Sequence, residues 1–251
     1  MESPLRQLIA GNWKMNGLTP ALGEAQALAA ALKQSPAKAR VALCPPATLL
    51  AAMADSLAGS DVLVGGQDCH AEACGAFTGD ISAEMLVDAG AELVILAHSE
   101  RRTYYGETNR LAAAKARAAL RAGLEPIICV GETLEERQAG RTLEVISRQV
   151  SGSVPVELKG RAFAVAYEPV WAIGTGLTPT LAQIEEAHRA IRIHLVKRLG
   201  ASGETAPILY GGSVKPSNAQ EILAAAEVGG ALVGGASLKA EDFLAIVRAS
   251  P

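Results

Sequence analysis

Short apolar runs alternate with longer, alanine-rich amphipathic segments from one end of the chain to the other. Short runs bounded by Gly, Pro, Asn or Thr are typical of strands that are buried on both faces of a parallel sheet. The pattern predicts eight strands: Leu5–Gly11, Arg40–Cys44, Val62–Gly65, Leu93–Ala97, Glu125–Val130, Phe163–Tyr167, Ile208–Tyr210 and Ala231–Val233.

The amphipathic segments between these runs predict helices, and several of them open with capping residues. Thr19 as N-cap and Pro20 at the first helical position predict a helix that runs to about Gln34. The predicted helices, or their capped starts, are Thr19–Gln34, Thr48–Leu57, Ser82–Ala89, Asn109–Ala122, Thr133–Glu136, Thr180–Gln183, Ser217–Gln220 and Glu241–Arg248. A long loop with several glycines, Gln67–Asp80, interrupts the alternation.

Strict alternation of strand and helix requires parallel strands, so we expect an α/β protein. Eight units in 251 residues give about 31 residues per unit, close to the size of a βαβ repeat. This matches a (β/α)8 barrel, whose typical length is about 250 residues. The chain has no linker or low-complexity segment, and residues 1–251 are therefore expected to form a single domain. A doubly wound sheet usually carries G-x-G-x-x-G after its first strand, whereas this chain has Gly11-Asn12-Trp13-Lys14 there.

Composition and net charge exclude several kinds of binding partner and indicate where the protein is located. With 49% hydrophobic and 20% charged residues the chain fits a soluble globular protein, and its net charge of −3 provides no basic field for nucleic acid. No stretch is long and apolar enough to span a membrane, and the first residues lack the pattern of a secretion signal. The four cysteines contain no C-x-x-C pair, which favours a reducing compartment. We therefore expect a cytoplasmic protein.

Polar residues gather at the carboxyl ends of the predicted strands, which is where (β/α)8 barrels carry their chemistry. They are Asn12, Lys14, Gln67, His98, Ser99, Glu100, Glu132, Glu168, Ser213, Gly234 and Gly235. The amino ends of the strands show nothing comparable. Separate strands thus deliver a carboxylate, an imidazole, an ammonium group and glycine-rich turns to one mouth of the barrel.

Glu168 is the most informative of these residues because it ends an apolar run and precedes a proline. Pro169 removes a backbone donor and disfavours the α region for Glu168, which ends the strand and directs the side chain outward. The loop that follows combines Trp171 with glycines, the composition of an apolar flap that closes over a site. A plain surface turn would explain an isolated glutamate, but the other residues at the mouth favour a catalytic base.

Two further features indicate a site for an anionic carbonyl compound. His98 starts a helical turn, whose N-terminus disfavours the imidazolium, so we expect a neutral ring that can donate to a carbonyl. The glycine pairs that end in Gly212 and Gly235 let backbone N–H groups approach an anion, although tight turns alone also use such glycines. Lys14 lies near the same mouth and needs a partner, which Glu100 could provide.

The remaining histidines give no reason to expect a metal site. His188 and His194 lie within a predicted amphipathic helix. His70 stands between Cys69 and Cys74, but further ligands are not evident and zinc prefers four. We therefore predict that no metal is bound.

Taken together, the motifs at the strand ends resemble those of the triosephosphate isomerases. The matching segments are Asn12–Gly17 (NWKMNG), Gly75–Gly79 (GAFTG), His98–Arg102 (HSERR), Tyr167–Gly176 (YEPVWAIGTG), Tyr210–Val214 (YGGSV) and Leu232–Leu238 (LVGGASL). The match runs in order along the whole chain, and the segment around Glu168 is highly specific.

The resemblance implies an isomerase of glycolysis and gluconeogenesis that interconverts dihydroxyacetone phosphate and glyceraldehyde 3-phosphate through an enediolate. Glu168 would be the base, and His98 would polarise the carbonyl. Lys14 and Asn12 would stabilise the developing oxyanion, with Glu100 orienting that network.

The resemblance also implies how the substrate and a second subunit are bound. Backbone groups at Gly174, Ser213, Gly234 and Gly235 would hold the phosphate, and no metal or organic cofactor would be required. The loop around Thr78 resembles one that inserts into a neighbouring subunit, which implies a homodimer.

Three positions depart from the pattern of the family without removing a catalytic group. Ala97 stands where a glycine often precedes the histidine, which is expected to add only a methyl group. Gly229 replaces an acidic residue before the last strand. Leu177-Thr178-Pro179 replaces a hinge that often reads Lys-Thr-Ala, and Pro179 restricts a segment that has to move.

Two alternatives remain, one of them also an enzyme and the other from a different functional class. Another phosphate-binding barrel enzyme, such as an epimerase, aldolase or lyase, would usually need a Schiff-base lysine, a metal set or a second acid, and no convincing set is present. A noncatalytic phosphate-binding barrel predicts loss of the base or the flap, and both are intact.

Overall fold

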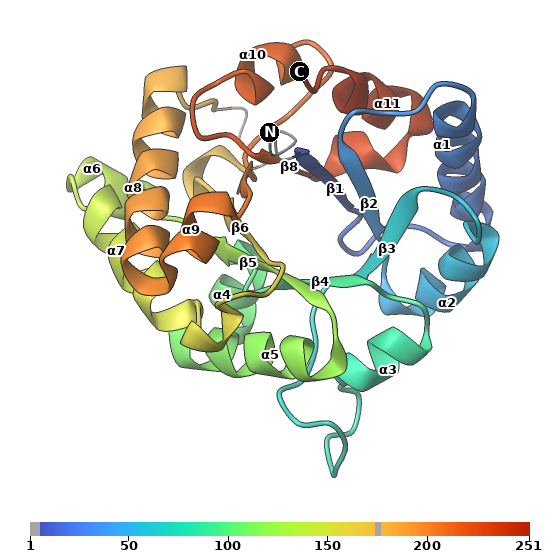
Figure 1. Cartoon of the computed structure of the whole chain (residues 1–251), viewed down its shortest axis with the longest axis horizontal. Helices are drawn as coiled ribbons and strands as arrows, with labels where there is room; N and C mark the ends of the chain where they lie inside the picture. Colours follow the sequence, from blue (N-terminus) through green and yellow to red (C-terminus); the bar gives the residue numbers. More distant parts are fainter. Residues whose placement is uncertain (1–5, 174–176) are drawn as a thin grey trace.

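Eight strands close into a parallel barrel in chain order in the computed structural model, which describes residues 6–173 and 177–251 (Figure 1). They are β1 (Leu8–Asn12), β2 (Arg40–Cys44), β3 (Val62–Gly66), β4 (Leu93–Leu96), β5 (Glu125–Val130), β6 (Ala164–Tyr167), β7 (Ile208–Tyr210) and β8 (Gly230–Val233). The ring closes where Leu8 of β1 pairs with Gly230 of β8. The predicted α/β class and (β/α)8 barrel are confirmed.

The strand bounds differ from the prediction by a few residues, and β4 shows the clearest reason. β4 ends at Leu96 rather than Ala97, because Ala97 has φ +56°, which takes it out of the extended region. At the other end of the chain, Leu5 was expected to begin the first strand and lies outside the described residues.

Helices surround the barrel on its outer face (Figure 1). In the described part of the chain they are α1 (Leu22–Gln34), α2 (Ala47–Ser56), α3 (Ala83–Asp88), α4 (Ser99–Tyr105), α5 (Asn109–Ala122), α6 (Leu134–Gln138), α7 (Thr142–Ser153), α8 (Leu181–Leu199), α9 (Ala201–Thr205), α10 (Ala219–Leu223) and α11 (Ala240–Arg248). The capping boxes at Thr133 and Thr180 are confirmed. The first of them opens only a short helix, because the chain turns through Gly140 at φ +69° before α7 begins.

Two of the predicted helix starts were wrong. Thr19 is the first residue of a short 3-10 helix, Thr19–Ala21, that precedes α1, and its N-cap is Leu18, which has no side-chain acceptor. Ser217 does not cap α10. Its N-cap is Asn218, whose side chain bonds to the loop before the helix instead of to the first turn.

Both faces of the barrel are buried, as expected for a parallel sheet. Alternate residues such as Leu8 and Ala10 fill the interior of the barrel, while Ile9 and Val41 pack outward in the layer between sheet and helices. This tightly filled interior leaves the loops at the carboxyl ends of the strands as the place for a site.

One loop leaves the body of the barrel. Residues 72–80, which include Thr78, are exposed, and Figure 1 shows their segment projecting beyond α3. At the base of the loop a parallel bridge joins His70 to Ser82. Among the described helices, none is long and apolar enough to cross a membrane.

Candidate active site

A cavity of about 760 Å³ opens at the carboxyl ends of the strands and contains most of the predicted site. Its lining includes residues from the start, the middle and the end of the sequence: Asn12, Lys14, His98, Ser213, Gly234 and Gly235. Gly174, the other predicted phosphate contact, lies outside the described residues.

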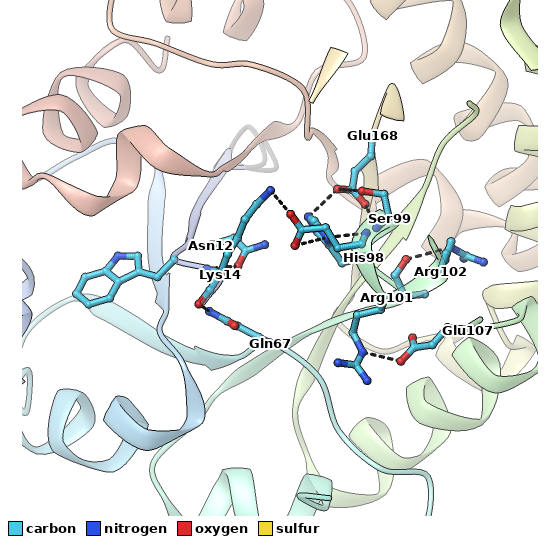
Figure 2. A network of polar contacts seen from close by, with 12 residues as sticks. Asn12, Lys14, Gln67, His98, Ser99, Arg101, Arg102, Glu107 and Glu168 are labelled. Atoms are coloured by element: carbon cyan, nitrogen blue, oxygen red, sulfur yellow. Dashed lines mark hydrogen bonds and ion pairs between the residues drawn. The ribbon is translucent and has the colours of Figure 1, made fainter. Parts of the chain in front are cut away.

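Lys14 sits at the centre of a polar network that reaches across this cavity (Figure 2). Its backbone has φ +53°, an uncommon conformation for a residue with a side chain. Two side chains fix that backbone, because Asn12 Oδ1 accepts from Lys14 N at 3.0 Å and Gln67 Nε2 donates to Lys14 O at 2.9 Å. The sequence places Gln67 at a strand end without indicating a role. In the structure its side chain holds the backbone of Lys14 in place.

Glu100 connects the ammonium group to the imidazole. Lys14 Nζ lies 2.7 Å from Glu100 Oε1, which confirms the predicted partner. The second oxygen, Glu100 Oε2, lies 3.4 Å from His98 Nδ1. Lys14 and His98 therefore both face the cavity of about 760 Å³.

Glu168 is almost completely buried, at 1% exposure, and its carboxylate rests on the start of α4 (Figure 2). Oε2 accepts from Ser99 N at 2.9 Å and Oε1 accepts from Ser99 Oγ at 3.1 Å. His98 Nε2 lies 2.8 Å from Oε1. Ser99 belongs to a motif found in the sequence, but its role as the partner of Glu168 was not predicted.

The protonation of His98 follows from its two neighbours. Nδ1 accepts from Glu100 N at 3.3 Å, so in the neutral ring the hydrogen lies on Nε2 and points at Glu168. Burial lowers the pKa of His98, but the charge and hydrogen bond of Glu168 outweigh it, so the pKa is raised. The helix N-terminus predicts the opposite direction for the His98 pKa, and that prediction was wrong because the Glu168 carboxylate lies against the ring.

The pKa of Glu168 shows the reciprocal effect. Burial raises it, but His98 and the two donors of Ser99 together hold the pKa below its ordinary value. Glu168 is therefore an ionised base at neutral pH. In this position it lines a separate cavity of about 230 Å³ with Ser99 and Arg102, next to the larger one.

Two backbone positions are more constrained than the sequence indicated. Ala97 is fully buried in the left-handed region, so the extra methyl group also brings backbone strain that glycine would avoid. At Gly131 a Cβ would lie 1.7 Å from Glu168 O, so the end of β5 can approach Glu168 only as glycine.

The loops on the anion side present backbone groups to the cavity. Asn218 shapes the first of them, since its Nδ2 donates to Ser213 O at 3.2 Å and its Oδ1 accepts from Lys215 N at 2.8 Å. In the second loop a Cβ on Gly234 would lie 3.6 Å from Lys14 Cε, which places that backbone beside the ammonium side chain. Neither loop contributes a carboxylate to the cavity lining, and the acidic residue on this side is Asp242 of α11.

Glu132 holds the segment that follows Glu168. Its side chain is fully buried, and Oε1 accepts from Tyr167 Oη at 3.1 Å, Trp171 Nε1 at 3.1 Å and Arg137 Nη1 at 3.0 Å. The guanidinium of Arg137 also lies over the Trp171 ring, 5.1 Å from its centroid. Glu132 stood out in the sequence only by its place at a strand end.

A sequence model described as "Triosephosphate isomerase" matches residues 7–250, nearly the whole chain. The chain belongs to the triosephosphate isomerase family. A relative named triosephosphate isomerase from Caulobacter vibrioides is 62% identical over 244 residues, covering 97% of this chain and 96% of its own. A second, from Afipia carboxidovorans, is 59% identical over 251 residues and covers all of both chains.

A solved structure supports the same family at the level of the fold. The crystal structure of triosephosphate isomerase from Bartonella henselae matches with a TM-score of 0.91 and 50% identity, covering 97% of this chain and 98% of that one. Within the described residues, no group of three or more His, Cys, Asp or Glu side chains could hold a metal ion.

Proposed function

We propose that the chain interconverts dihydroxyacetone phosphate and glyceraldehyde 3-phosphate, as its membership of the triosephosphate isomerase family implies, with Glu168 as the base. The observation that carries the assignment of residues is the 2.8 Å contact between His98 Nε2 and Glu168 Oε1, at the edge of a cavity that also holds Lys14. A buried carboxylate, an imidazole and an ammonium group suffice for proton transfer next to a carbonyl.

Glu168 has to leave Ser99 to reach the substrate, because its carboxylate rests beside the large cavity and not in it. It then removes a proton from the carbon next to the carbonyl and returns it to the neighbouring carbon. With Glu168 displaced, His98 loses the carboxylate that raises its pKa and donates Nε2–H to the substrate oxygen. The positive charge of Lys14 stabilises the oxyanion that develops there.

The phosphate is placed on the opposite side of the same cavity. Backbone groups of Ser213, Gly234 and Gly235 line that side, and Gly174 completes the proposed set. A dianion bound there lies close to Lys14, so the ammonium group serves both binding and catalysis.

The test is turnover of glyceraldehyde 3-phosphate in a coupled assay, without added metal or cofactor and after dialysis against a chelator. Full activity under these conditions is expected. Turnover that appears only on addition of a divalent metal would favour another phosphate-binding barrel enzyme. Binding of inorganic phosphate with no turnover would favour a noncatalytic barrel.

A homodimer is part of the proposal, supported by the exposed apolar side chains near the mouth of the barrel. Met15 is 95% exposed, Tyr104 77% and Tyr105 71%, and Phe77 lies on the projecting loop beside Thr78. Exposed apolar groups in such number are typical of an interaction surface. Sedimentation at micromolar concentration should give about twice 25.9 kDa, and Thr78→Arg should shift it towards 25.9 kDa; a wild-type species of 25.9 kDa alone would contradict the dimer.

We also infer one domain and a cytoplasmic location. Pairing of β1 with β8 joins the two ends of the described chain in one sheet, which supports a single unit. Cys44, Cys69 and Cys129 are buried and form no disulfide, as in proteins of a reducing compartment.

A further inference from the structure

Arg102 is a half-buried cation whose hydrogen bonds all go to uncharged groups. Nε donates to Ala97 O at 3.0 Å and Nη1 to Asn109 Oδ1 at 2.8 Å. Nη2 donates to both Cys129 O and Ser153 Oγ at 3.0 Å. In this way one guanidinium joins the end of β4, the end of β5, the start of α5 and the end of α7.

The neighbouring arginine has the usual arrangement, which makes Arg102 stand out. Arg101 pairs with Asp68 at 2.8 Å and with Glu107 at 2.6 Å. For Arg102, no carboxylate lies within ion-pair distance in the part of the chain that the structure describes. A buried charge is costly unless another charge faces it.

Among the carboxylates, Glu168 has the strongest charge interaction with Arg102, ahead of Glu107. Ser99 and Arg102 are three residues apart in α4, so both lie on the same side of that helix, and both line the cavity of about 230 Å³ together with Glu168. Figure 2 shows Arg102 extending from α4 on the side of Ser99 and Glu168 that is away from Lys14.

The site needs a positive charge near Glu168 and also a neutral His98. Glu168 is buried and needs a nearby positive charge to remain ionised, and His98 is the closest group that could provide one. An imidazolium would satisfy the carboxylate but would remove the neutral donor that the proposed reaction uses. A guanidinium cannot lose its proton under these conditions, so it can supply the charge without changing its state.

We propose that Arg102 is a positioning residue for the reaction: its permanent charge keeps Glu168 ionised beside a neutral His98, and its Nε–H fixes the Ala97 carbonyl. The second part concerns geometry. Ala97 is in the left-handed region and directly precedes His98. A hydrogen bond that fixes the Ala97 carbonyl therefore also fixes the backbone position from which the His98 side chain extends. The inference rests on the proposed function, since it assigns the protonation states that this function requires.

Other groups also face Glu168 and define the background for a test. The His98 ring and the Ser99 donors contact it directly, and the Cys129 thiol approaches from β5. Burial raises the pKa of that thiol well above its ordinary value, so it stays neutral. Lys14 and Glu100 lie beyond His98, and Glu136 lies across the small cavity, bonded to Arg148 at 3.4 Å.

The experiment separates the charge of Arg102 from its hydrogen bonds with three variants. Arg102→Met removes both the charge and the hydrogen bonds. Arg102→Lys keeps the charge but loses the set of donors that the planar guanidinium provides. Ser153→Ala removes one acceptor while leaving the guanidinium in place. The readout is the pH midpoint of the Glu168 carboxyl carbon, followed by NMR in protein labelled with ¹³C at glutamate Cδ and assigned with Glu168→Gln. Because this measurement needs no turnover, it is independent of whether the proposed activity exists.

We expect the midpoint to rise by about one pH unit in Arg102→Met and to stay at the wild-type value in Arg102→Lys and Ser153→Ala. In the coupled assay Arg102→Lys should lose about 10-fold in kcat with little change in KM, because the Ala97 carbonyl is no longer fixed. Equal midpoints in Arg102→Met and wild type, or equal shifts in Arg102→Met and Ser153→Ala, would overturn the proposal.

If Arg102→Met does not fold, Arg102→Lys decides alone: a displaced midpoint or a wild-type kcat overturns the proposal, and an unchanged midpoint with reduced kcat supports it. Wild-type protein without turnover would instead contradict the proposed function, whatever the midpoints show.

Discussion

His98 Nε2 lies 2.8 Å from Glu168 Oε1, so the imidazole and the carboxylate are direct partners. Each controls the protonation of the other, since the carboxylate raises the pKa of His98 and the ring helps to lower that of Glu168. In the proposed reaction the substrate separates this pair, so His98 loses the carboxylate that raises its pKa.

Replacing Glu168 with glutamine should remove the base while preserving the side chain's shape. A positioned base contributes about 10²–10⁴ in rate, so kcat should fall by about 1,000-fold while KM changes little. Glu135→Gln is the matched control, because Glu135 is an exposed residue of α6. Turnover of Glu168→Gln within a few-fold of wild type would show that another group takes the proton.

Replacing Lys14 with methionine should reduce both binding and turnover. The variant loses the ammonium group beside the anion loops and the charge for the oxyanion, and removal of one such group costs about 10²–10³ in kcat. Glu100 then has no partner at 2.7 Å, so Glu100→Gln combined with Lys14→Met should show less than the product of the single effects. Steady-state kinetics of the four proteins measures this coupling, and fully multiplicative effects would argue against the network.

Ala97 offers a test of backbone strain. Valine at φ +56° is a severe outlier for a β-branched side chain, so Ala97→Val should lower the free energy of unfolding by about 2 kcal/mol or more. Ala97→Gly relieves the strain but loses a buried methyl group worth about 0.8 kcal/mol, so its stability should lie within about 1 kcal/mol of wild type. Urea denaturation of both variants checks this, and equal losses would contradict the role of φ.

The barrel was predictable because its signals are local. Short apolar runs, capping boxes at Thr133 and Thr180, and polar residues at strand ends all appear in the sequence before any contact is known. Thr19 and Ser217 were predicted as N-caps from residue type alone, and Leu18 and Asn218 occupy those positions in the structure. Ala97 was also misjudged, since a φ angle depends on how the neighbouring chain is packed.

The gathering of the site's side chains at one end of the barrel was predictable, but their contacts were not. The position of Lys14, Glu100, His98 and Glu168 at strand ends follows from the topology of parallel strands. Which of them touch depends on side-chain directions over many residues of separation, such as Gln67 bracing Lys14. The predicted direction of the His98 pKa shift was wrong for that reason.

Glu132 should be essential for the segment that follows Glu168. Glu132→Ala leaves the donors of Tyr167, Trp171 and Arg137 without their shared acceptor, and removal of one partner of a buried ion pair costs about 3–5 kcal/mol. Thermal unfolding should show this loss, and Glu132→Gln, which retains an acceptor oxygen, should recover part of it. A stability equal to that of wild type in Glu132→Ala would contradict the arrangement.

His188 should make the protein less stable as the pH falls. It is fully buried, its Nδ1 bonds to Glu227 O at 3.1 Å, and burial lowers the pKa to about 4 from the ordinary value of 6.5. Between these values the unfolded chain binds more protons than the folded one, so the free energy of unfolding falls as pH drops from about 6.5 to about 4, by about 3 kcal/mol in total. His188→Asn and His188→Gln have no imidazole to titrate at this position. The difference in free energy of unfolding between wild type and each variant should therefore shrink as the pH falls over that range, measured by urea titrations. A difference that stays constant with pH would mean that His188 does not titrate on unfolding.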